Sequence, residues 1–147
     1  MIKGKWIGYY KYNDKKFQYL VGFEQTNFEI EIQSVNRNRF EGIVQDDLST
    51  GGMKDAGIIK GKIINNKMKF VKQMPVMYGI YSNGKGKYFP DKKHPKIYYQ
   101  GMISDDKKTI KGNWGFRNSE SFITRFLGTK SLGDGTFEMK LQELTKS

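Results

Sequence analysis

The sequence predicts an all-β protein, a single antiparallel up-and-down β-barrel of about 8–10 strands, and three observations support this. First, apolar and polar residues alternate with a period of two in about ten segments, the pattern of half-buried strands. Second, almost no segment carries a helical period. Third, short turns separate the segments, and closure would remove the exposed edges of such a sheet. We expect one domain over residues 1–147, with an open β-sandwich as the alternative.

The first predicted strand covers residues 2–12 and turns at Asn13-Asp14. Its alternate residues are glycine or aromatic and share one face: Gly4, Trp6, Gly8, Tyr10 and Tyr12. A hairpin partner is predicted over residues 17–23, where Phe17, Tyr19, Val21 and Phe23 fall on one side. A third strand over residues 28–34 places Phe28, Ile30 and Ile32 opposite glutamate and glutamine residues.

The fourth strand directs Phe40, Gly42 and Val44 inward and is followed by a loop over residues 46–52. Residues 57–64 and 67–72 form the clearest hairpin, because the two asparagines between them tolerate the left-handed backbone of a tight turn. Glycines on predicted inner faces fit strongly bent strands. They are Gly8, Gly42, Gly61, Gly101 and Gly112.

A second hairpin is predicted over residues 97–104 and 109–116, with Ile110, Gly112, Trp114 and Phe116 on one face. The last strand covers residues 136–141. Between the hairpins, residues 75–95 are punctuated by proline and glycine, and we expect a long hairpin loop over one mouth of the barrel. Residues 118–128 fit either a short strand or a turn of helix.

Composition narrows the class of protein. The chain has no cysteine, which excludes disulfides, thiolate metal sites and cysteine nucleophiles. We find no secretory leader and no apolar run long enough to cross a bilayer, so we expect a cytoplasmic protein. The formal net charge of +11 predicts attraction to polyanions and acidic partners, although lysines spread over a barrel also serve solubility.

No catalytic or metal-binding motif is present, so we expect neither an enzyme nor a cofactor. The single histidine, His94, lies between lysines and has no partners for a hydrolytic triad or a zinc site. The segment from Gly79 to Gly86 begins like a phosphate-binding loop, but Gly86 stands where serine or threonine is required. The loop from Asp46 to Asp55 lacks the spacing of a calcium site.

Two charged residues fall on faces that the alternation directs inward, Asp46 and Lys72. A charge inside a barrel is costly unless it is paired or near water. Two interpretations stay open: both strands end there and the charges reach solvent, or the two residues lie near the open mouth and pair with each other or with a ligand. The inward aromatic residues would line either a cavity or a solid core. They are Tyr10, Tyr12, Tyr19, Tyr99, Trp114 and Phe116.

The triplet Gly4-Lys5-Trp6 at the head of the first strand resembles the Gly-x-Trp of calycin barrels, which include lipocalins, fatty-acid-binding proteins and avidins. The resemblance implies that Trp6 closes the floor of the barrel and that an arginine from near the C-terminal end, Arg117 or Arg125, covers it. It also implies binding of a small apolar molecule. A hairpin after the first strand, instead of the helical lid of fatty-acid-binding proteins, is an expected difference.

Three functions are consistent with these features. The first is a non-enzymatic, lipocalin-like barrel that binds a small apolar or amphipathic ligand inside, with Lys72 or a tyrosine hydroxyl orienting it. The second is a basic interaction module that binds an acidic protein or nucleic acid through exposed lysines and outer aromatic residues such as Tyr9 and Tyr98. The third, an enzyme with Asp46 or Asp47 as acid or base, has no supporting motif.

Overall fold

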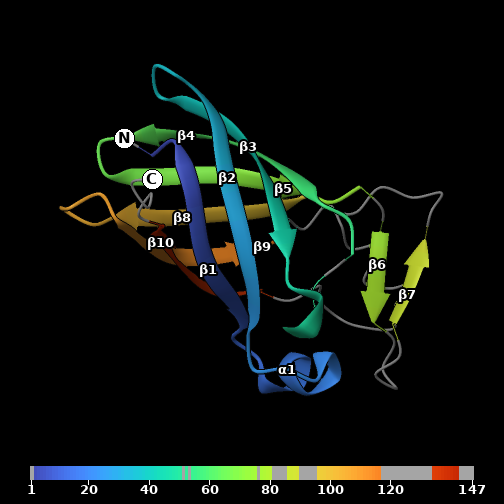
Figure 1. The fold of residues 1–147 in the computed structure, drawn as a ribbon. Helices are drawn as coiled ribbons and strands as arrows, with labels where there is room; N and C mark the ends of the chain where they lie inside the picture. Colours follow the sequence, from blue (N-terminus) through green and yellow to red (C-terminus); the bar gives the residue numbers. More distant parts are fainter. Residues whose placement is uncertain are drawn as a thin grey trace.

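The computed structural model is a closed barrel of antiparallel strands, which confirms the predicted fold class (Figure 1). The structure describes residues 2–50, 52, 54–75, 77–80, 86–89, 96–116 and 134–142. The order around the barrel is β1-β10-β9-β8-β5-β4-β3-β2. The barrel strands are β1 (Gly4–Tyr12), β2 (Thr26–Asn36), β3 (Arg39–Asp46), β4 (Gly57–Ile64), β5 (Lys67–Gln73), β8 (Ile97–Ile103), β9 (Thr109–Gly115) and β10 (Asp134–Leu141).

Each barrel strand pairs with its neighbours along the chain once β6 and β7 are set aside, and β1 closes the sheet against β10. Tight turns set this order where the backbone can become left-handed. Asn65 has φ 57° in the turn between β4 and β5, which confirms the predicted asparagine turn. Lys107 has the same left-handed conformation, with φ 63°, in the turn between β8 and β9. The meander therefore follows from local turn chemistry.

The predicted strand over residues 17–23 is wrong, because these residues lie largely in a short helix, α1 (Lys15–Val21). The side chain of Asp14 accepts a hydrogen bond from the Lys16 amide at the N-terminal end, and Gly22 adopts φ 88° at the C-terminal end. β1 consequently pairs with β2 and not with residues 17–23. In Figure 1, α1 lies at the end of the barrel where β1 ends and β2 begins. The described helices include none long and apolar enough to cross a membrane.

The region predicted as a long hairpin loop contains two short strands, β6 (Met77–Ile80) and β7 (Gly86–Phe89). They pair with each other in a separate two-stranded sheet, drawn beside the barrel in Figure 1. His94 and residues 118–128 lie outside the described residues. The 3-10 turn η1 (Leu48–Thr50) occupies the predicted loop after β3.

Buried and exposed residues alternate along most of the strands, with a register shift in β2 after Ile32. In β3, for example, every second residue from Phe40 is buried and the residues between are exposed. The resulting core is one cluster from all eight strands, and several of its side chains are completely buried. Burial of large apolar side chains stabilises each strand by about 1.5–3 kcal/mol per side chain. The most deeply buried include Trp6, Ile59, Met68 and Ile110.

Candidate functional site

Asp46 and Lys72 face the barrel interior and pair with each other. Lys72 Nζ lies 2.8 Å from Asp46 Oδ1 and 3.0 Å from Oδ2, so both carboxylate oxygens accept from the ammonium group. Their side chains are only 2% and 3% exposed. The interpretation in which both charges reach solvent is therefore wrong, and the predicted mutual pairing is confirmed. A role for either residue in binding a ligand stays a prediction.

Tyrosines surround this buried pair. Lys72 Nζ lies 4.9 Å from the centre of the Tyr10 ring, in cation–π geometry. Burial, followed by the negative charge of Asp46, raises the pKa of Tyr12 to about 12. The same two causes, in the same order, raise the pKa of Tyr10 and of Tyr99 well above the ordinary value. These hydroxyls stay protonated wherever the protein is folded at neutral pH.

We expect these tyrosines to make the protein sensitive to alkali. An unfolded tyrosine ionises near pH 10, so below that pH both states keep the proton and the shift has no effect. Between about pH 10 and 12 the unfolded chain releases protons that folded Tyr12 retains, so the free energy of unfolding falls as pH rises. Chemical denaturation across this window should show a smaller fall for Tyr12→Phe. Ionisation of all nine tyrosines near pH 10 in a still folded protein, seen at 295 nm, would contradict this.

The inward aromatic residues pack against one another. The rings of Phe70 and Tyr99 stack with centroids 4.6 Å apart, and Phe137 meets Tyr99 edge-on at 5.1 Å. Trp114 lies edge-on to Tyr12 at 4.9 Å, and its Nε1 donates to the carbonyl of Thr136 at 3.1 Å. Such aromatic pairs add about 0.5–1.5 kcal/mol each beyond the area they bury. Within the described residues, this part of the interior is therefore filled by side chains.

Of the two remaining predicted site residues, one contacts the core and the other is exposed. Phe116 follows β9, is partly buried and meets Trp114 edge-on at 6.2 Å. Tyr19 is 85% exposed on α1, so its predicted place in the interior is wrong.

The predicted barrel floor is only partly described. Trp6 is completely buried, and its Nε1 donates to the carbonyl of Ile2 at 2.8 Å. Gly4 begins β1 with φ 133°, a conformation that favours glycine. The predicted covering residues, Arg117 and Arg125, lie outside the described residues.

A groove of about 930 Å³ crosses the outer face of the barrel, perpendicular to β3, β4, β5, β8 and β9. Each of these strands contributes three consecutive residues, and the middle one faces the core. The floor is therefore the backbone of one cross-strand row: Phe40, Gly61, Phe70, Tyr99 and Trp114. Strand spacing makes the groove about 19 Å long, with its two walls about 7 Å apart along the strands.

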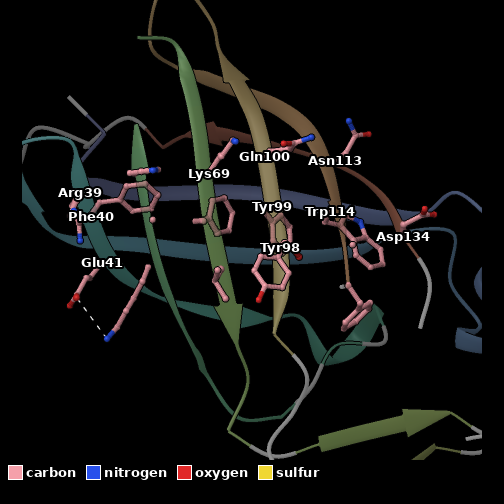
Figure 2. Close-up of a pocket in the computed structure, with 17 residues that line it drawn as sticks. Arg39, Phe40, Glu41, Lys69, Tyr98, Tyr99, Gln100, Asn113, Trp114 and Asp134 are labelled. Carbon is pink, nitrogen blue, oxygen red and sulfur yellow. Dashed lines mark ion pairs between the residues drawn. The ribbon is translucent and has the colours of Figure 1, made fainter. Parts of the chain in front are cut away.

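The two walls are the outward-facing rows on either side of this floor. One wall runs through Arg39, Lys62, Lys69, Gln100 and Asn113, which are directly opposite one another on successive strands. The other runs through Glu41, Lys60, Val71, Tyr98 and Gly115 and ends at Asp134. Figure 2 shows Lys69, Gln100 and Asn113 on one side, Glu41 and Tyr98 on the other, and the rings of Phe40, Tyr99 and Trp114 between them.

Positive charge is concentrated at one end of the groove. We call Arg39, Lys62 and Lys69 the basic row, and none of the three forms an ion pair with a residue that the structure describes. Glu41 is held by Lys60 at 3.9 Å, the dashed line in Figure 2. A second hollow beyond the basic row is lined by Lys67 together with Lys62 and Lys69. The basic row is therefore a ridge of unneutralised cations between two hollows.

The acidic residues proposed as acid or base have structural partners. Asp46 is engaged by Lys72. Asp47 accepts hydrogen bonds from the Ser49 amide at 2.9 Å and from the Ser49 hydroxyl at 2.7 Å, and the pKa of its carboxyl is lowered chiefly by the bond from that hydroxyl. Among the described residues, no group of three or more histidine or acidic side chains is arranged to hold a metal ion.

Comparison with known proteins adds no identity: no family model, no curated protein and no solved structure matches the chain significantly. The closed barrel is compatible with a calycin-like architecture. A hairpin after the first strand was the expected difference from fatty-acid-binding proteins, and the helix α1 lies there instead.

Proposed function

We propose that this protein is a basic, non-enzymatic interaction module that binds a polyanion through the outer groove. The observation that carries the proposal is the basic row, in which three cations lie directly opposite one another on β3, β4 and β5. The formal net charge of +11 acts in the same direction, because it attracts polyanions over a longer range.

The basic row is unfavourable for the barrel alone. Like charges directly opposite each other on neighbouring strands destabilise a sheet, whereas opposite charges stabilise it by about 0.2–1 kcal/mol. The chain places opposite charges on neighbouring strands elsewhere: Lys111 lies directly opposite Glu138 and pairs with it at 3.9 Å, and Lys5 pairs diagonally with Glu29 at 3.6 Å. A bound anion would supply the countercharge that the basic row lacks. Solubility alone does not require the three cations to be adjacent.

The lipocalin-like alternative, an apolar or amphipathic ligand inside the barrel, stays a prediction, as do the calycin relationship and the cytoplasmic location. The aromatic packing around Tyr99 and Trp114 gives an interior ligand less support than the outer groove has. Lys72 would also have to exchange Asp46 for the ligand's polar group before it could orient that ligand.

The proposal predicts a salt-dependent retention that depends on position as well as on charge. The triple variant Arg39→Ala, Lys62→Ala, Lys69→Ala should elute from a heparin column at clearly lower salt than the parent protein, because its groove contacts fewer anionic groups. The matched control changes three exposed lysines outside the groove, Lys3, Lys54 and Lys140, to alanine. Equal elution of the two variants would show that net charge alone causes retention and would contradict the proposal.

A further inference from the structure

We infer that the polyanion is a single-stranded nucleic acid that passes over the basic end of the groove, with its phosphates on the basic row and a base extended along the groove over β8 and β9. This inference rests on the proposed function and adds the class of ligand. It follows from the way charged, amide and aromatic side chains are separated along the groove.

The groove has two chemically different halves. Over β3, β4 and β5 the wall carries the basic row. Over β8 and β9 the same wall continues with the carboxamides of Gln100 and Asn113, which lie directly opposite each other and are exposed. Neither carboxamide forms a side-chain hydrogen bond with a described residue. A carboxamide can donate and accept at once, as recognition of a base edge requires.

The opposite wall is apolar and aromatic where it crosses β5 and β8. Val71 and Tyr98 are partly buried neighbours across β5 and β8, and Phe116 lies at the same end of the groove. Aromatic side chains on a sheet provide stacking surfaces for bases, each worth about 1–3 kcal/mol. An acidic peptide has no planar group for such a surface. A nucleotide carries both the charge for the first half and the ring for the second.

Negative charge and width restrict the ligand further. Asp134 lies at the aromatic end and would repel a phosphate there, which leaves the basic end for the phosphates. Walls about 7 Å apart cannot admit a duplex, whose major groove alone is about 12 Å wide. The basic row covers about 10 Å of the groove, and the remaining length over β8 and β9 is left for a base.

Fluorescence anisotropy tests the inference with three labelled probes: an oligothymidylate of about eight nucleotides, the abasic strand of the same length, and an oligoglutamate peptide with the same number of negative charges. The oligothymidylate should bind most tightly. Its affinity should fall with salt with a slope of about −2 on logarithmic axes, as expected for three phosphate contacts, and Lys62→Ala should reduce that slope by about 0.7. Lys140→Ala, on the outer face of β10, should leave the slope unchanged.

Tyr98 provides the readout that separates stacking from charge. Tyr98→Leu should weaken binding of the oligothymidylate on the order of tenfold without changing the salt slope, while Tyr98→Phe should bind like the parent protein. Binding of the abasic strand should be the same in all three. Tighter binding of oligoglutamate, or an unchanged affinity in Tyr98→Leu, would overturn the nucleic-acid assignment and leave the polyanion proposal standing. Equal heparin retention of the two triple variants would overturn both.

Discussion

Replacing Lys72 with methionine is expected to lower the free energy of unfolding by about 3–5 kcal/mol, because it leaves the carboxylate of Asp46 buried without its partner. The two side chains are 3% and 2% exposed, so water cannot replace the lost ammonium group without opening the barrel. Urea denaturation followed by tryptophan fluorescence measures the effect. Removing the carboxylate as well, in the double variant Asp46→Leu, Lys72→Met, should restore most of the stability, since apolar replacement of a buried pair is often neutral or favourable.

Lys5→Met provides the matched control. Lys5 also pairs with an acidic residue, Glu29, at 3.6 Å, but both side chains are about half exposed, at 52% and 50%. Water therefore solvates the partner that remains, and the loss should stay below about 1 kcal/mol. If Lys72→Met lost no more stability than Lys5→Met, the pair would be solvated in solution, and Lys72 would be accessible to a ligand after all.

The barrel could be predicted from the sequence because its strands alternate with a period of two and its turns carry asparagine and aspartate. The helix α1 was missed for a physical reason: a seven-residue segment is too short for periodicity to separate helix from strand. Phe17, Leu20 and Val21 also have helical spacing in the sequence. The better signal was at the ends, where Asp14 and Gly22 are a typical N-cap and C-cap.

The candidate sites differ in what sequence could reveal. Alternation placed Asp46 and Lys72 on inner faces, but their direct contact joins residues 26 positions apart on β3 and β5. The outer groove was not predicted at all. Arg39 aligns with Lys62 through the pairing of β3 with β4, and Lys62 aligns with Lys69 through the pairing of β4 with β5. Only that register turns three scattered cations into one row, and the hairpin turn at Asn65 is the one part of it visible in the sequence.

Gly112→Ala is expected to lower the free energy of unfolding by about 3 kcal/mol. This is the upper end of the usual cost of overpacking, because the new methyl group clashes with backbone atoms that cannot rotate away. Gly112 on β9 lies directly opposite Gly101 on β8, and a Cβ there would overlap the carbonyl oxygen of Gln100. The methyl group would force β8 and β9 apart at the position where Gln100 and Asn113 form the wall of the groove, so oligonucleotide binding should weaken as well.

Gly115→Ala on the same strand is the control, since the atom nearest to its new Cβ, Asp134 Cβ, would be at 3.5 Å, an ordinary contact. That variant should match the parent protein or gain up to about 1 kcal/mol through the smaller entropy of the unfolded chain. Equal stability of the two alanine variants, measured by urea denaturation, would mean that β8 and β9 do not approach as closely in solution as the barrel requires.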